Sequence, residues 1–177
     1  ILGGAKVSDK IGVINNLITK CDKIIIGGAM AYTFIKASGG RIGASLVEND
    51  KLELALELME KAKKAGVEFI LPADNTIGKK LEDEDELEYK YADSDSVPDG
   101  WMGLDIGPKS CMKFEKAIMG ARTIVWNGPM GVCEVDKTAE GTLKLARAVA
   151  ETGAISIVGG GDSVAAVEKL GFADKMT

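Results

Sequence analysis

The sequence predicts an α/β fold, a three-layer sandwich in which a mostly parallel sheet carries helices on both faces. Short β-branched runs that end in glycine and open into helical patterns recur along the chain. These runs are continuously apolar, as strands buried on both faces are. With 177 residues, 46% of them apolar, and only 4 prolines, the chain has the composition of one globular domain with a real core.

The expected elements follow from these alternating patterns. Gly66 comes directly after an amphipathic stretch and is a good residue to end that helix. Ligands of such sheets bind beyond the carboxyl ends of the strands. The expected strands are residues 23–27, 68–71, 123–126 and 155–158, with residues 1–2 as a strand stub. The expected helices are residues 8–17, 30–37, 49–65, 109–119, 137–150 and 163–170.

Residues 74–107 interrupt the alternation and predict a long surface excursion. Like-charge runs are usually solvated, so we expect an acidic solvent-facing segment there. The ligand order of a calcium-binding loop is absent. The acidic residues are Glu82, Asp83, Glu84, Asp85, Glu86, Glu88, Asp93, Asp95 and Asp99.

The charged and titratable residues exclude several functional classes. The 22 basic and 27 acidic residues give a net charge of −5 without a basic run, which argues against nucleic-acid binding. The longest nearly apolar stretch, residues 23–32, is too short to cross a membrane. The absence of histidine removes the usual general base and most zinc sites. Any chemistry here runs without imidazole.

The cysteines and the two ends of the sequence indicate its context. Cys21, Cys111 and Cys133 are odd in number and far apart, as packing thiols of a reducing compartment are. No secretory leader is visible, so we expect a cytoplasmic protein. Ile1 lies within an expected strand, and no helix or tail follows up to Thr177. We expect one domain over residues 1–177, cut at both ends.

Two glycine-containing clusters in the first part of the chain are candidate ligand sites. In the first, residues 3–10, Lys6 and Lys10 share a helix face if the segment is helical; alternatively they are solvated lysines beside Ser8 as an N-cap. The second, residues 27–30, is a strand-to-helix turn suited either to a ligand or to tight packing. Neither the dinucleotide G-x-G-x-x-G nor the P-loop pattern occurs.

Two further clusters follow in the second part of the chain. Residues 100–108 and 126–134 hold Trp101 and Trp126, either as an apolar slot or as core, and Glu134 is a candidate acceptor for sugar hydroxyls. Residues 159–163 open a helix with three glycines that can approach phosphate oxygens. There Asp162 is either an N-cap or a Mg²⁺ ligand, and Ser163 a phosphate donor.

These residue types together predict a nucleotide phosphate site. The clusters supply two lysines, glycine-rich strand ends, a carboxylate suited to magnesium and a carboxylate suited to a sugar. Phosphoryl transfer depends mainly on positioning and charge neutralisation. No proton need be removed when the acceptor is already an anionic carboxylate, so the lack of histidine is no obstacle.

Five segments in this order resemble the phosphoglycerate kinase family: ILGGAKVSDK, IIIGGAMAYTF, GWMGLDIGP, VWNGPMGVCE and IVGGGDS. The resemblance spans essentially the whole chain and implies a Rossmann-like C-terminal domain that binds ADP or ATP with Mg²⁺. That family passes a phosphoryl group between 1,3-bisphosphoglycerate and ADP in glycolysis. The resemblance further implies a monomeric intact enzyme, with a separate N-terminal phosphoglycerate-binding domain that is missing here.

The resemblance also implies roles for matched residues. Lys10 would contact the transferred phosphoryl group and Lys6 the nucleotide phosphates. Glu134 would hold the ribose and Asp162 the Mg²⁺. Catalytic roles fall on Lys6, Lys10, Gly160 and Gly161. The adenine slot would be framed by Gly28, Ala29, Gly103 and Leu104 and lined by Asn127 and Pro129, and the phosphate tail bound by Gly160, Gly161 and Ser163.

Two departures from the family pattern set the remaining expectations. Cys133 stands where the family often has an aromatic residue, and the family's next glycine-rich turn is absent after Thr177. We therefore expect the chain alone to bind nucleotide without efficient turnover. The alternatives are a dinucleotide-binding oxidoreductase domain, which would need G-x-G-x-x-G, and a folded remnant that binds no ligand.

Overall fold

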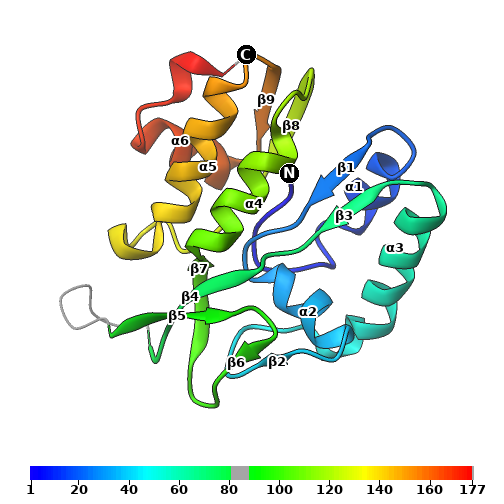
Figure 1. Cartoon of the computed structure of the whole chain (residues 1–177), viewed down its shortest axis with the longest axis vertical. Helices are drawn as coiled ribbons and strands as arrows, with labels where there is room; N and C mark the ends of the chain where they lie inside the picture. The colour runs from blue at the N-terminus through cyan, green and yellow to red at the C-terminus, as the bar shows by residue number, and fades with distance from the viewer. Residues whose placement is uncertain (81–87, 177) are drawn as a thin grey trace.

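The main sheet is parallel, as the sequence predicts. The computed structural model describes residues 1–80 and 88–176, so the acidic residues from Glu82 to Glu86 and the last residue, Thr177, fall outside it. The strands form two parallel pairs, β1 with β3 and β8 with β9 (Figure 1). Their bounds are β1 (Lys23–Ile25), β3 (Glu68–Ile70), β8 (Thr123–Asn127) and β9 (Ile155–Gly159).

The first residues of the chain join the two pairs into one sheet. Leu2 forms parallel bridges to both Ile26 and Asn127. Its backbone N donates to Ile25 O at 2.8 Å, and Asn127 N donates to Ile1 O at 2.9 Å. The order across the sheet is therefore β3, β1, the Leu2 segment, β8 and β9. The expected strand stub at residues 1–2 is the centre of the sheet.

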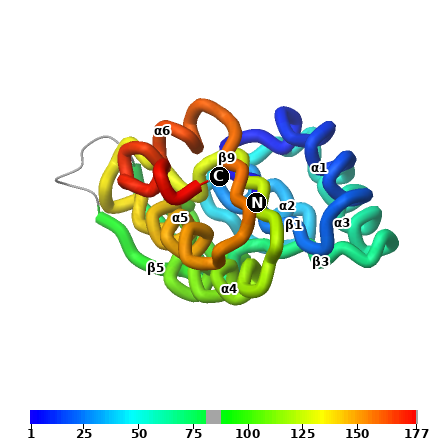
Figure 2. The backbone as a smooth tube through the Cα atoms, turned by 90° about the horizontal axis from the view of Figure 1, so that it is seen from above, coloured from blue at the N-terminus to red at the C-terminus, as the bar shows by residue number. Residues whose placement is uncertain are grey.

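Helices cover both faces of this sheet, which makes the molecule a three-layer sandwich. Ile24 and Ile26 pack in one core cluster with α1, α2 and α3, whereas Ile25 packs in another with α4, α5 and α6. This division follows because successive side chains of a strand point to opposite faces. The two groups of helices lie apart in both views (Figures 1 and 2). The helices are α1 (Ile11–Leu17), α2 (Met30–Ala37), α3 (Leu52–Lys64), α4 (Pro108–Ile118), α5 (Glu140–Glu151) and α6 (Gly161–Lys169).

The helix boundaries agree with the sequence pattern to within two residues, except that α1, α3 and α5 begin three residues later than predicted, α3 and α5 after 3-10 turns. Gly66 follows α3 with a φ of 74°, the left-handed conformation expected of a residue that ends a helix. Helix α1 begins at Ile11 instead of Ser8, so Lys6 and Lys10 do not share a helix face. Ser8 is not its N-cap, because its backbone N and its Oγ donate to the Glu48 carboxylate at 3.2 and 2.5 Å. Short 3-10 turns occur at Asn49–Lys51, Asp136–Thr138 and Ala173–Lys175.

The prediction of a surface excursion over residues 74–107 is wrong for the backbone, although the acidic residues Glu88, Asp93, Asp95 and Asp99 are exposed as expected. The segment forms an antiparallel sheet in the order β5, β4, β7, and its strand β6 pairs in parallel with β2. Every residue of β4 is buried, although Asp74, Asn75 and Thr76 are polar. Apolar periodicity does not reveal a strand whose buried side chains are polar. The bounds are β2 (Arg41–Ile42), β4 (Asp74–Gly78), β5 (Tyr89–Asp93), β6 (Ser96–Val97) and β7 (Met102–Ile106).

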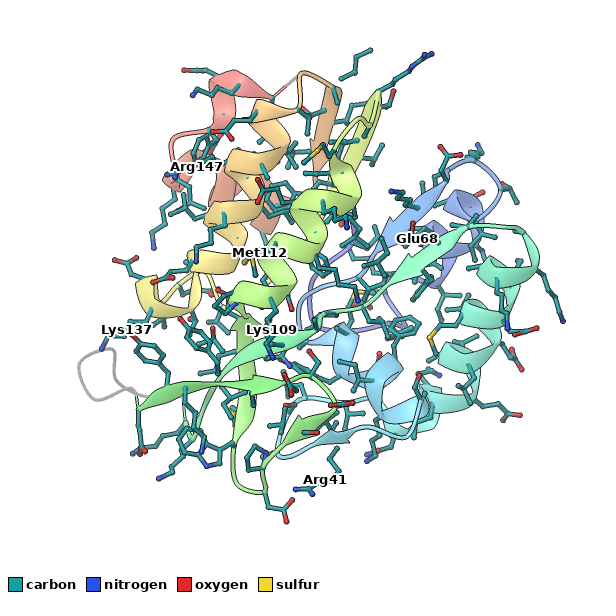
Figure 3. All side chains as sticks on the ribbon, viewed as in Figure 1. Arg41, Glu68, Lys109, Met112, Lys137 and Arg147 are labelled. Atoms are coloured by element: carbon teal, nitrogen blue, oxygen red, sulfur yellow. The ribbon has the colours of Figure 1, made fainter. Side chains whose placement is uncertain are left out.

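The buried carboxylate of Asp74 caps helix α4 from a different element. Gly107, the N-cap residue of α4, has no side chain to cap with, and Asp74 accepts hydrogen bonds from Lys109 N at 3.1 Å and Ser110 N at 2.7 Å. The Ser110 hydroxyl donates to Asp74 O at 2.6 Å. Figure 3 shows Lys109 at the end of α4 that lies over β4 and β5, where its Nζ donates to Asp93 at 2.8 Å. The second sheet is thereby fastened to the start of α4.

None of the helices in the described ranges is long and apolar enough to cross a bilayer.

We expect Asp74→Ala to lower the free energy of unfolding by about 2–3 kcal/mol, because α4 loses a charged cap and two buried N–H groups lose their acceptor. Urea denaturation measures the loss. The matched control is Asp99→Ala, an exposed aspartate, which should change stability by less than about 0.5 kcal/mol. Equal effects of the two substitutions would contradict the capping role.

Candidate functional site

One pocket of about 760 Å³ lies at the carboxyl ends of the parallel strands, where the fold class places ligands. Loops that follow the Leu2 segment, β1 and β8 form one part of its wall, and β7, α6, Tyr32 of α2 and Leu46 after β2 form the rest. It brings together residues of all four glycine-containing clusters, the last of them at the start of α6. Its lining comprises Gly4, Ala5, Gly28, Ala29, Tyr32, Leu46, Met102, Gly103, Leu104, Asp105, Pro129, Met130, Gly131, Val132, Cys133, Glu134, Asp162, Ala165, Ala166 and Lys169.

Glycines let three of these loops touch backbone to backbone. Gly28 has a φ of 67°, and a Cβ there would lie 2.5 Å from both the N and the O of Gly4. Gly4 N donates to Pro129 O at 3.1 Å, and Gly28 N donates to Met130 O at 3.1 Å. A Cβ on Gly128 would overlap the backbone of Gly3. We call these contacting loops the glycine junction; it leaves no room for side chains.

Another part of the pocket wall is largely apolar. Met102 and Leu104 of β7 form a small hydrophobic cluster with Val132 and Val135. Val132 N donates to Leu104 O at 2.9 Å, which fixes the loop after β8 against β7. Apolar surface together with glycine backbone makes a slot suited to a flat ring.

Three carboxyl groups line the pocket, in different environments. Glu134 is exposed in the loop after β8, and Asp162 is exposed in the first turn of α6. Asp105 is buried and accepts hydrogen bonds from Gly141 N at 2.6 Å and from Ile106 N at 2.8 Å. Burial raises the pKa of Asp105 to about 8, although the two N–H donors act in the opposite direction. Near neutral pH the exposed carboxylates therefore carry the negative charge of the pocket.

Seven of the residues singled out from the sequence line the pocket. They come from the loops after β1 and β8, from β7 and from α6, which are far apart in the sequence. They are Gly28, Ala29, Gly103, Leu104, Pro129, Glu134 and Asp162.

The other singled-out residues lie outside this lining. Lys10 is half-buried, and its Nζ donates to Asn127 Oδ1. A Cβ on Gly160 would lie 3.2 Å from Asn127 Nδ2, so the loops after β8 and β9 meet at this amide. Gly160 has a φ of 89° and stands at the N-cap of α6, followed by Gly161. Lys6 is exposed.

The interpretation of Asp162 as an N-cap does not hold at α6. Gly160 is its N-cap residue, so Asp162 is not, and no side chain in the described residues caps this helix. Ser163 is fully buried, and its hydroxyl accepts a hydrogen bond from Gly128 N. It fastens the start of α6 to the loop after β8. Its contact with a phosphate stays a prediction.

The two tryptophans do not form the slot. Trp126 is fully buried in the core between the sheet and α4 and α5, with its Nε1 donating to Gly128 O at 2.7 Å. Trp101 is only half-buried, so the core interpretation fails for it. The ammonium groups of Lys79 and Lys90 lie 5.0 and 3.9 Å from its ring centroid. These contacts are cation–π interactions outside the pocket.

The free cysteines behave as packing thiols. Cys21, Cys111 and Cys133 are all half-buried. Burial raises the pKa of all three thiols, that of Cys111 to about 11. Little thiolate is then present at neutral pH, and the thiolate is the reactive form.

Some pocket residues were not selected from the sequence. Gly4 and Ala5 belong to the first glycine-containing cluster, in which only the charged Lys6 and Lys10 have side chains that indicate a ligand. Tyr32 and Asp105 were hidden because each reads as an ordinary member of a buried helix or strand. Glu48 holds the loop of the first cluster through Ser8, a contact between residues 40 apart that no local pattern reveals.

A sequence model of the family described as Phosphoglycerate kinase matches residues 1–177. The chain belongs to the phosphoglycerate kinase family. Over all 177 residues it is 56% identical to a phosphoglycerate kinase of Clostridium novyi and 54% identical to one of Clostridium tetani, and it covers 44% of each of those proteins.

Solved structures of the family have the same fold. The structure of phosphoglycerate kinase from Coxiella burnetii matches with a TM-score of 0.95 and 42% identity, covering 99% of this chain and 45% of that one. The enzyme from Pyrococcus horikoshii matches with a TM-score of 0.73 and 30% identity, covering 96% and 43%. The chain thus spans less than half the length of these family members.

We expect Gly28→Ala to destabilise the chain by at least about 3 kcal/mol, because a left-handed alanine is strained and its Cβ meets the Gly4 backbone. Gly66→Ala is the matched control: its φ of 74° imposes similar strain, but nothing lies within 4 Å of the new Cβ. Its cost should be about 1 kcal/mol. Urea denaturation measures the free energy of unfolding of both variants. Equal losses of stability would mean that the glycine junction can accommodate a side chain at Gly28.

Proposed function

We propose that this chain is the nucleotide-binding part of a phosphoglycerate kinase and binds ADP and ATP with Mg²⁺. The observation that carries the proposal is the pocket itself, in which glycine backbone and apolar side chains line the wall while Glu134 and Asp162 stand in separate loops. The glycine junction and Leu104 accept the base. Glu134 accepts hydrogen bonds from ribose hydroxyls, which an exposed carboxylate is free to do.

The start of α6 suits the phosphates. Gly160 and Gly161 present backbone without side chains at the positive end of a helix of nine residues. Lys6 and Lys10 add two cations from the loop after the Leu2 segment. The Lys10 ammonium is already oriented by Asn127, at the point where the loops after β8 and β9 meet.

Asp162 is the residue that would hold the Mg²⁺. Its carboxylate is exposed in the pocket lining, and among residues 1–80 and 88–176 no hydrogen bond or ion pair uses it. No cluster of three or more metal-binding side chains occurs in those ranges. A single protein carboxylate completed by phosphate oxygens and water is the set that Mg²⁺ prefers with nucleotides. When bound, the ion neutralises phosphate charge.

In the whole enzyme the proposed reaction moves a phosphoryl group from the acyl phosphate of 1,3-bisphosphoglycerate to the terminal phosphate oxygen of ADP. The products are 3-phosphoglycerate and ATP. Lys10 and the backbone N–H groups at the start of α6 would stabilise the charge on the transferring group. A separate phosphoglycerate-binding domain would supply the second substrate. The chain alone would bind nucleotide without efficient turnover.

A calorimetric titration tests the binding proposal directly. The 177-residue chain is titrated with ADP, with and without Mg²⁺, and with NADH as the control ligand. We expect saturable ADP binding that responds to Mg²⁺, and none of comparable strength for NADH. Tight NADH binding without ADP binding would instead favour a dinucleotide-dependent oxidoreductase.

We expect Asp162→Asn to abolish the Mg²⁺ dependence of ADP affinity while leaving binding of metal-free ADP within about threefold, because only the metal loses its ligand. The measurement is the same titration at several Mg²⁺ concentrations. Asp174→Ala, an exposed aspartate in the last 3-10 turn, is the control and should keep the full dependence. An unchanged Mg²⁺ response in Asp162→Asn would place the ion elsewhere.

We expect Lys10→Ala to lower kcat of the complete two-domain enzyme by about 100-fold or more and to weaken ADP binding by less than tenfold. The reason is that its charge acts mostly on the transition state. Steady-state kinetics together with ADP titration separate the two effects. Lys20→Ala, an exposed lysine just after α1, is the control. Equal losses in kcat and in binding would make Lys10 a simple ground-state ligand.

A further inference from the structure

A tyrosine hydroxyl remains unexplained in the wall of the pocket. Tyr32 lies in the first half of α2, and its side chain is only 4% exposed, yet it lines the pocket. No hydrogen bond to its hydroxyl occurs within residues 1–80 and 88–176. In the same ranges no fully buried side-chain N or O atom lacks a partner, so the unpartnered hydroxyl must be open to the pocket. A hydroxyl in this position is free to form a hydrogen bond with a ligand.

Strand β7 has a glycine, Gly103, at the point where the Tyr32 ring lies against it. A Cβ on Gly103 would overlap the Oη and Cζ atoms of Tyr32. Gly103 does not have a positive φ, so its backbone conformation does not require glycine. Close approach of the tyrosine ring explains the glycine in the middle of the strand. Ser45 fixes the strand there by accepting a hydrogen bond from Gly103 N at 2.9 Å.

The hydroxyl is a donor over the whole working pH range. Burial raises the pKa of Tyr32, and nearby Asp105 raises it further once Asp105 ionises above its own pKa of about 8. Two charged groups of α5 act in turn on the Asp105 carboxyl: Glu140 raises its pKa and Lys144 lowers it. Each Asp105 oxygen accepts a backbone N–H group, and no hydrogen bond joins Asp105 to Tyr32 within the described residues. The tyrosine proton is left for an acceptor in the pocket.

We propose that the Tyr32 hydroxyl donates a hydrogen bond to a ring atom of the nucleobase and so helps to select the base. This inference rests on the proposed nucleotide-binding function. The sugar and the phosphates have their own polar partners in Glu134 and the start of α6, on the loops after β8 and β9. Tyr32 instead stands beside Gly103 and the apolar side chains of β7, where a flat heterocycle with nitrogen acceptors fits.

Tyr32→Phe removes only the hydroxyl and tests the proposal. The matched control is Tyr91→Phe, on exposed β5 and outside the pocket lining. Each 177-residue protein is titrated with ADP and with inorganic diphosphate, and its thermal midpoint is measured without ligand. We expect Tyr32→Phe to weaken ADP binding by about 3- to 10-fold, to leave diphosphate binding within twofold, and not to lower the midpoint, because no hydrogen bond is lost in the free protein.

Two results would overturn the role of Tyr32 alone. One is ADP affinity equal to that of the Tyr91→Phe control. The other is a drop of more than about 3 °C in the midpoint of the ligand-free variant, which would make the hydroxyl a structural group. A different result tests the underlying function: if the unmodified chain shows no saturable ADP binding, the nucleotide proposal falls, and this inference falls with it.

Discussion

The contact of three loops through bare backbone is the constraint on which the rest of the pocket depends. At the glycine junction, Gly4, Gly28 and Gly128 all adopt positive φ, and the backbone of Gly28 lies against Gly4 while that of Gly128 lies against Gly3. The junction sits directly beyond the Leu2 segment, which links the two strand pairs into one sheet. A Cβ at Gly28 or Gly128 would overlap the backbone of a neighbouring loop, so a side chain at either position would force these loops apart.

The parallel sheet and its helices follow from the sequence because both have simple periodicities. Continuous apolar runs mark β1, β3, β8 and β9, and amphipathic spacing with Gly66 marks α3 and its end. The antiparallel sheet was not predicted because β4 buries polar side chains, and the partners of two of them, Ser110 for Asp74 and Ser94 for Asn75, lie 36 and 19 residues away. Its polar interior is satisfied by tertiary hydrogen bonds, which no local pattern encodes. Only the folded chain shows that these residues are inside.

The site could be predicted in part for a similar reason. Glycine clusters at strand ends and isolated carboxylates are visible in a sequence, and Glu134 and Asp162 do line the pocket. Tyr32 and Asp105 cannot be recognised in this way, because each occupies an ordinary position in a helix or a strand. They become pocket residues only in the folded chain, where Tyr32 of α2 lies against Gly103 of β7. The pairing of Lys10 with Asn127 likewise joins residues 117 apart in the sequence.

The makeup of the pocket wall bears on the entropy of binding. Much of the surface around Gly4, Gly28 and Gly103 is main chain already held by hydrogen bonds to Pro129, Met130 and Ser45. Main chain fixed in this way has no rotamers to freeze when a ring settles against it, whereas each flexible side chain immobilised at an interface costs about 0.5–1.5 kcal/mol. The glycines, often regarded as sources of flexibility, here supply a rigid and preorganised surface.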